Sequence, residues 1–127
     1  MTTRELQDFA VMFFAAVDAQ NATALKQYFS EEITLQMANL PITEGGESVI
    51  AAFKAADERF SSIKHSIEGI WIGDWEQGPV VSVEAIAQYE FPDGRTLELP
   101  VTSTLRLTQN KKVANYKIFM DPLPAFS

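Results

Sequence analysis

The sequence predicts an α+β domain in which N-terminal helices pack on the concave face of one cone-shaped, curved antiparallel sheet. Apolar residues recur at helical spacing through most of the first 60 positions, and they alternate in strand fashion from Ile63 onwards. Turn-forming residues separate the later strands. Because helices come first and hairpin-linked strands last, the pattern favours segregated α+β architecture. At 127 residues, the chain fits a single domain over residues 1–127.

The first predicted helix covers residues 3–20. Thr2 and Glu5 have the spacing of a capping box, in which the two side chains satisfy free amides at the helix start. The apolar stripe of this helix is Leu6, Phe9, Phe13, Ala16 and Val17. Asn21 is placed to cap a second, short helix over residues 22–29.

A short strand over residues 33–40 ends before Pro41, and a third helix follows over residues 47–60. From Ile63 the side chains alternate, so that His65 and Trp71 are predicted to share one face of a strand. The remaining strands are expected at 80–91, 96–108 and 113–121, separated by turns such as Pro92-Asp-Gly.

Composition excludes several classes of function. The chain has no cysteine and one histidine, which excludes thiol chemistry, cysteine-ligated metals and a multi-histidine metal site. It carries 10 Lys+Arg against 17 Asp+Glu, and the net charge of −7 disfavours nucleic acid and anionic membrane surfaces as partners. No glycine-rich phosphate loop is present, so no cofactor is expected. The absence of a signal-peptide pattern and of a long apolar run predicts a cytoplasmic protein.

Several stretches, taken in order, resemble the nuclear transport factor 2-like superfamily, and within it the SnoaL-like and limonene-epoxide-hydrolase-like branch. They are residues 18–33, 39–53, 80–84, 92–95 and 115–121. The resemblance implies a cystatin-like cone with an interior that takes a small hydrophobic molecule. This superfamily includes isomerases, cyclases, hydrolases, dehydratases and binding domains without catalysis, so fold alone does not assign an activity.

The resemblance makes Asp121 the candidate catalytic residue. It ends the last strand, where the epoxide hydrolases have a catalytic Asp, and a carboxyl in an apolar cavity could act as general acid or base. The alternative is that Asp121 only caps the turn before Pro122. The Arg and second Asp of the epoxide hydrolases fall at Ala85 and Ala87, so their mechanism is not expected here. The stretch matching the ketosteroid isomerases' basic Asp, residues 36–39, has no carboxylate.

Seven further residues are candidates for contact with a ligand inside the cone. They are Asn39, Tyr28, His65, Trp71, Tyr89, Phe13 and Phe53. The polar members could orient a ligand or a water, and the aromatic members could form cavity walls. For each, an ordinary structural role in the core, a turn or a strand edge is the competing interpretation.

Three functions therefore remain open from the sequence. The first is a cofactor-independent isomerase, cyclase or lyase-like enzyme that uses Asp121 on a small hydrophobic molecule. The second is a binding domain without chemistry, which the alanines at positions 85 and 87 favour. The third is association of two copies through the opposite sheet face, which carries Val80, Ser82, Ile86, Thr102 and Thr104. A homodimer is compatible with either of the first two.

Overall fold

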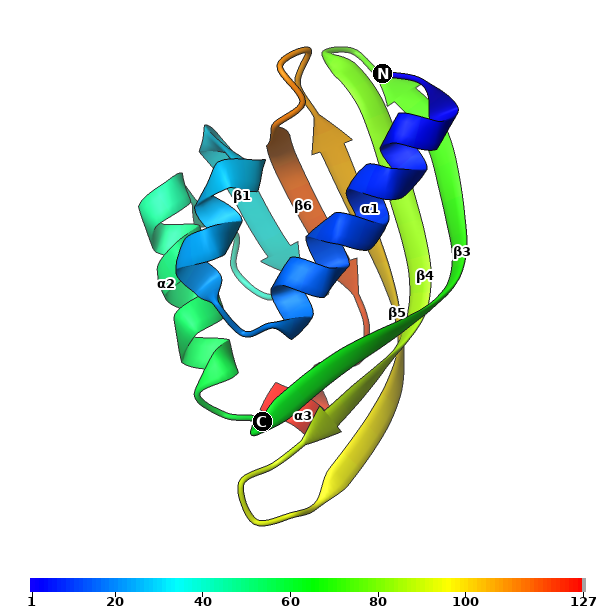
Figure 1. The fold of residues 1–127 in the computed structure, drawn as a ribbon. Coiled ribbons are helices and arrows are strands. Elements are labelled where there is room, and N and C mark those ends of the chain that lie inside the picture. Colours follow the sequence, from blue (N-terminus) through cyan, green and yellow to red (C-terminus); the bar gives the residue numbers. More distant parts are fainter. Residues whose placement is uncertain (127) are drawn as a thin grey trace.

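The computed structural model describes residues 1–126 and shows one six-stranded sheet with helices on one face (Figure 1). The elements are α1 (Thr3–Asp18), the 3-10 helix η1 (Ala22–Tyr28), β1 (Phe29–Met37), β2 (Thr43–Glu44), α2 (Gly46–Asp57), β3 (Ser62–Trp75), β4 (Gly78–Glu90), β5 (Thr96–Leu107), β6 (Val113–Phe119) and α3 (Leu123–Phe126). This confirms the α+β prediction.

The strand order is β2-β1-β6-β5-β4-β3, and the sheet is curved but not closed. All neighbouring strands are antiparallel except β1 and β6, which run parallel. The helix α1 lies across the concave face, with α2 beside it and α3 near the start of β3 and the end of β4 (Figure 1). Within residues 1–126, no helix is long and apolar enough to cross a membrane.

The first helix forms as its sequence predicts. Thr2 Oγ1 accepts from the Glu5 amide at 3.1 Å, and Glu5 Oε1 accepts from the Thr2 amide at 3.2 Å, which completes the capping box. The face towards the sheet is buried through Leu6, Ala10, Phe13, Phe14 and Val17. This burial, rather than helix propensity, fixes α1 against the sheet.

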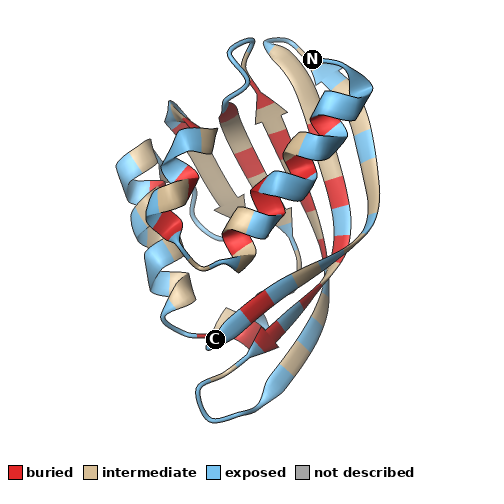
Figure 2. Ribbon diagram, viewed as in Figure 1, coloured by how far each residue is buried: buried red, intermediate tan, exposed pale blue. Residues whose placement is uncertain are grey.

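Buried residues form two clusters, and Figure 2 marks the buried positions along the ribbon in red. The larger one lies under α1, where the fully buried Phe13 ring makes edge contacts with Phe14, Tyr28 and Tyr116. The smaller one lies beyond the end of α1 and consists of Phe60, Ile63, Ala85, Ala87, Tyr89, Val101 and Ala125. The boundary between the two clusters is where the candidate site lies.

Two short elements escaped the sequence prediction. The two residues of β2 extend the sheet beside β1. The short helix α3 packs its Ala125 into the smaller buried cluster. In α3, Ala125 is buried, and Arg59 Nε and Nη2 donate to its carbonyl oxygen at 3.3 and 3.2 Å. A turn of four residues is too short for hydrophobic periodicity to reveal it.

The prediction that His65 and Trp71 share a strand face is wrong. A β-bulge in β3 leaves Glu68 unpaired between Ile67 and Gly69, and the alternation of side chains reverses there. His65 therefore faces the concave side, whereas Trp71 lies 55% exposed on the convex side. The Trp71 indole covers Gly69, where an added Cβ would lie 2.2 Å from the ring.

We predict that Phe13→Ala lowers the free energy of unfolding by about 3–5 kcal/mol, because it leaves a cavity among close-packed rings. Met12→Ala is the matched control on the same helix, since Met12 is 60% exposed, and it should cost less than about 1 kcal/mol. Urea unfolding of both variants measures the difference. Equal losses would contradict the assignment of Phe13 to the core.

Candidate functional site

A small inner chamber of about 70 Å³ lies between the concave face of the sheet and the ends of α2 and α3. Ten of its lining residues are apolar or thioether side chains: Val17, Met37, Phe53, Ala56, Phe60, Ile63, Val101, Ile118, Met120 and Phe126. The polar ones are Asp57, His65, Tyr89, Ser103 and Tyr116. An apolar enclosure with a few convergent polar groups is typical of small-molecule sites.

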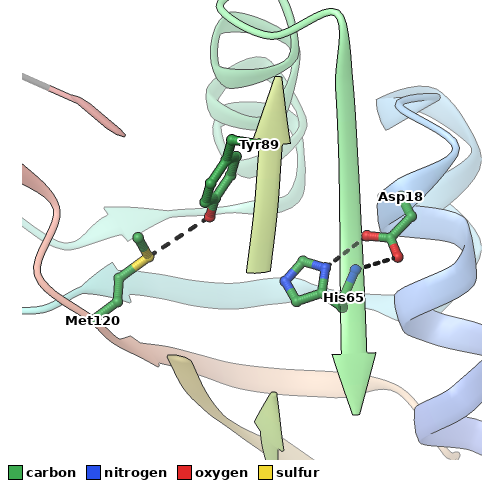
Figure 3. A network of polar contacts seen from close by, with 4 residues as sticks. All are labelled: Asp18, His65, Tyr89 and Met120. Atoms are coloured by element: carbon green, nitrogen blue, oxygen red, sulfur yellow. Dashed lines mark hydrogen bonds and ion pairs between the residues drawn. The ribbon is translucent and has the colours of Figure 1, made fainter. Parts of the chain in front are cut away.

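His65 is held in the chamber wall by Asp18, the last residue of α1 (Figure 3). Asp18 Oδ2 accepts from the His65 backbone amide at 2.8 Å, and Asp18 Oδ1 lies 2.6 Å from His65 Nδ1. The imidazole side chain is only 9% exposed, and Phe14 packs against it with ring centres 4.9 Å apart. Both the position and the rotation of the ring are therefore fixed.

This contact determines which ring nitrogen is available. A carboxylate has only acceptor sites, so Nδ1 must carry the proton in the bond to Asp18. In the neutral ring, Nε2 then keeps its lone pair. Figure 3 shows that Nε2 points away from Asp18, to the side where Tyr89 and Met120 lie. His65, Tyr89 and Met120 all line the chamber. The pair thus presents a proton acceptor to the chamber.

Tyr89 brings a hydroxyl from β4 into the same chamber. Tyr89 is 7% exposed, and its ring centre lies 4.6 Å from that of Phe60. Its hydroxyl donates to Met120 Sδ at 3.9 Å. Burial, and secondarily the negative charge of Asp18, raises the pKa of Tyr89 to about 12. The phenol is therefore a hydrogen-bond donor throughout the neutral range. A thioether is a weak acceptor, so a ligand oxygen could replace it.

Two more hydroxyls stand behind Tyr89. Ser103 is buried, and its side chain and that of Tyr116 both line the chamber. Burial raises the pKa of the Tyr116 phenol above its usual value; Ser103 opposes this shift, and the nearby Tyr89 and Asp18 add to it. These groups place hydrogen-bonding capacity deep in the chamber.

Asp57 lines the chamber from the end of α2. Partial burial raises the pKa of its carboxyl above the usual value. The segment from Asp57 to Phe60 is bonded to the residue that follows α1 by two positions, because Gln20 Nε2 donates to the backbone oxygens of Asp57 at 3.2 Å and of Phe60 at 3.0 Å. Gln20 adopts φ 55°, which turns the chain sharply after α1 and lets the Gln20 side-chain amide reach Asp57 and Phe60.

An outer groove of about 430 Å³ adjoins the chamber between β1, α2 and α3. Its walls are mainly apolar: Leu35, Met37, Leu40, Pro41, Thr43, Ala52, Phe53, Ala55, Ala56, Arg59, Ile118 and Phe126. Five of these residues also line the chamber, namely Met37, Phe53, Ala56, Ile118 and Phe126. The two hollows therefore share one wall.

The expectation that Asp121 points into the cone is corrected by the structure. Asp121 is exposed beyond the end of β6, and its Oδ1 accepts from the Leu123 amide at 3.1 Å. This is the turn-capping alternative, in which Asp121 starts the Asp-Pro turn that leads into α3. An exposed carboxyl lacks the desolvation on which the acid/base argument depended.

The other predicted ligand contacts divide among the site, the core and the exposed surface. His65, Tyr89 and Phe53 line the chamber. Tyr28 and Phe13 lie elsewhere, in the aromatic cluster under α1, with ring centres 5.5 Å apart. Asn39 is exposed in the turn after β1, and Trp71 faces the convex side because of the bulge; neither lines the chamber.

Sequence reasoning missed Asp18, which holds His65, and also the chamber residues Asp57, Ser103 and Tyr116. Asp18 occupies the last turn of α1, where the helix dipole disfavours an acid and no basic side chain is present. An acid in this unfavourable position needs a partner from elsewhere in the chain, and the single histidine was an available one. Within residues 1–126, no group of three or more carboxylates or histidines is placed to hold a metal ion.

The sequence profile of the SnoaL-like domain matches residues 10–116 of the chain. This chain belongs to the SnoaL-like family. No curated protein matches its sequence. This match confirms the SnoaL-like resemblance, and solved structures, among them a nuclear transport factor 2-like protein of unknown function from Exiguobacterium sp. 255-15, share the fold.

Three solved structures have the same fold as this SnoaL-like domain, although their sequence identity to it is low. A protein provisionally named a SnoaL-like polyketide cyclase, from Jannaschia sp. CCS1, is 16% identical with TM-score 0.78, over 92% of this chain and 85% of that one. AusH from Aspergillus nidulans is 17% identical with TM-score 0.78, over 94% and 86%. The epoxide hydrolase/cyclase-like enzyme SalBIII, which has a role in pyran ring formation in salinomycin, is 14% identical with TM-score 0.74, over 93% and 92%. At these identities the likeness shows the fold alone.

We predict that neutral His65 of this SnoaL-like domain is protonated on Nδ1 and that Asp18→Asn moves the proton to Nε2. The Asn side chain can still accept from the His65 amide, but its NH₂ group then faces Nδ1 as a donor. Because the chain has one histidine, ¹⁵N-histidine labelling reports the ring without assignment ambiguity. A parent protein protonated on Nε2 would contradict the assigned orientation.

We predict that the domain loses stability as pH rises from 10 towards 12. The pKa of Tyr89 is about 12 in the folded state against 10.0 normally. Above pH 10 the Tyr89 phenol ionises in the unfolded chain but stays neutral in the folded one, and this difference favours unfolding. The full difference corresponds to about 2–3 kcal/mol. Tyr89→Phe should reduce the slope of the unfolding free energy against pH between 10 and 12, and buried Tyr116 should leave part of that slope in place. An unchanged slope would show that Tyr89 is not buried as described.

Proposed function

We propose that the protein is a cofactor-independent enzyme of the isomerase, cyclase or dehydratase kind, acting on a small hydrophobic organic molecule. The observation that supports this is the Asp18–His65 pair, which presents the Nε2 lone pair inside an apolar chamber. A base held by a carboxylate, close to a phenolic donor, is a general acid/base arrangement. His65 and Tyr89 take the roles that the sequence analysis gave to Asp121.

The chemistry that fits these groups begins with a proton transfer to His65 Nε2 from a C–H or O–H group of the substrate. Asp18 stabilises the resulting imidazolium through the Nδ1 bond. Tyr89 O–H donates to the oxygen on which negative charge develops. The proton on Nε2 then returns to another substrate atom, which gives an isomer, or to a departing hydroxyl, which leaves as water.

The names of the structural relatives support the same class of chemistry without assigning it. They include a cyclase and a dehydratase, both by provisional name, and an epoxide hydrolase/cyclase-like enzyme. Epoxide hydrolysis by the mechanism of the limonene epoxide hydrolases is not proposed, because buried alanines stand at positions 85 and 87. Positioned acid/base catalysis alone contributes about 10²–10⁴-fold, which suits an easy proton transfer.

A second candidate function is binding without chemistry. The small volume of the inner chamber, about 70 Å³, favours it, since typical ligand sites measure roughly 300–1,000 Å³. In that case the Asp18–His65 pair holds α1 on β3 and supplies one polar contact to the ligand.

We also propose that two copies associate through the convex sheet face. Trp71 and Phe119 are exposed there by 55% and 52%, beside the hydrogen-bonded pair Ser82 and Thr104. Large exposed aromatic side chains on a sheet are typical of interfaces. A cytoplasmic location and the identity of the ligand stay predictions from the sequence and from this chemistry.

The proposed enzyme is tested with 2-octanone in D₂O, where abstraction of an α-proton appears as loss of the α C–H signal in the proton NMR spectrum. We predict that the parent protein accelerates exchange and that His65→Gln reduces the acceleration about 100-fold or more. Gln keeps a polar side chain of similar length but cannot act as a base at neutral pH.

Asp121→Asn is the matched control, because Asp121 is exposed and outside the chamber. It should exchange 2-octanone at the parent rate. Loss of exchange in Asp121→Asn, with His65→Gln unaffected, would overturn the proposed roles. If the parent accelerates exchange of no alkan-2-one from butanone to 2-decanone, binding without chemistry is favoured instead.

A further inference from the structure

We infer that the outer groove is the second half of the ligand site, and that the natural ligand is an apolar molecule carrying one uncharged oxygen function at the end that reaches His65. The inference rests on the proposed function only in taking the inner chamber as a small-molecule site. It adds the shape of the ligand, its polarity and the wall that selects its length.

The first argument is that the two hollows share a wall. Five residues line both hollows, and the side chains of Met37, Phe53 and Phe126 among them have the rotatable bonds needed to open the shared wall. The chamber holds about 70 Å³ and the groove about 430 Å³. A molecule of ordinary substrate size that reaches His65 must extend outwards, and the groove adjoining that wall is large enough to take the remainder.

The second argument is the distribution of polarity. In the chamber the hydrogen-bonding groups of His65, Tyr89 and Ser103 converge, whereas the groove is lined by aliphatic and aromatic side chains apart from Thr43 and Arg59. Arg59 donates to the Ala125 carbonyl and lies over the Phe126 ring at 5.7 Å. It thereby holds α3 against the groove.

The third argument concerns charge at the polar end. Asp57 lines the chamber, Asp18 is bonded to His65 in its wall, and the charge of Asp18 acts on both Tyr89 and Tyr116. A carboxylate or phosphate placed there would be repelled. A hydroxyl instead donates to His65 Nε2 and accepts from Tyr89, and a carbonyl accepts from Tyr89. The chamber therefore favours an alcohol or a ketone over an acid.

The test uses 1-butanol, 1-hexanol and 1-octanol as unreactive probes, with ¹³C-methyl methionine NMR as the readout. The chain has four methionines. Met37 lines both hollows and Met120 lines the chamber, whereas Met1 and Met12 are exposed elsewhere. We expect 1-octanol to shift the Met37 and Met120 signals saturably and to leave the other two in place. Affinity should rise by about fourfold for each added methylene that is buried.

Two variants on α2 separate the groove from the rest of the surface. Ala52 lines the groove, whereas its neighbour Ala51 lines a different hollow beside η1 and β1. Ala52→Trp should abolish the gain from 1-butanol to 1-octanol, and Ala51→Trp should keep it. Equal 1-octanol affinity in both variants overturns the role of the groove.

Two further outcomes also overturn the inference. A shift of Met37 without Met120 means that the molecule does not reach the chamber. Tighter binding of octanoate than of 1-octanol contradicts an uncharged end. Failure of the proposed function looks different: 1-octanol then binds through both hollows, while no His65-dependent proton exchange is observed.

Discussion

The contact between Asp18 and His65 is the interaction on which the rest of the site depends. Two oxygens of one carboxylate bind the backbone amide and the ring of the same residue, at 2.8 and 2.6 Å. They join the end of α1 to the start of β3, through two residues that are 47 positions apart in sequence. The backbone bond fixes where the strand lies, and the ring bond fixes which nitrogen faces the chamber. A single carboxylate thus sets both the helix position and the chemistry available inside the sheet.

The surroundings of this pair explain why the chamber suits a weakly polar ligand. Apolar walls strengthen each electrostatic interaction, and Tyr89 stays a donor because its phenol is buried next to a negative charge. Buried Ala87 is directly paired with His65 between β3 and β4, so a small side chain lies beside the imidazole. The aromatic cluster around Phe13 packs α1 against the sheet, so the Asp18 carboxylate is presented to His65 from a rigid helix.

The sequence predicted the fold much better than the site. Hydrophobic periodicity located the main helices and the long strands, because each has a continuous buried face. It failed at Glu68, where one unpaired residue moved Trp71 to the opposite face, and a bulge of this kind leaves no mark in the alternation. Asp121 was chosen by resemblance to a strand end, but the Asp-Pro turn uses its carboxylate locally. Asp18 was missed because its partner is distant in sequence, and only the tertiary structure brings the two together.

The coupling free energy between Asp18 and His65 tests this account most directly. It is obtained by urea unfolding of the parent, Asp18→Ala, His65→Phe and the double variant at neutral pH, where Phe keeps the ring contact with Phe14 but removes the ring nitrogens. The account predicts a favourable coupling on the order of 1–3 kcal/mol, as for a buried hydrogen bond to a charged group. A coupling within about 0.3 kcal/mol of zero would mean that the carboxylate does not hold the imidazole, and the assignment of Nε2 as the chamber's base would be lost.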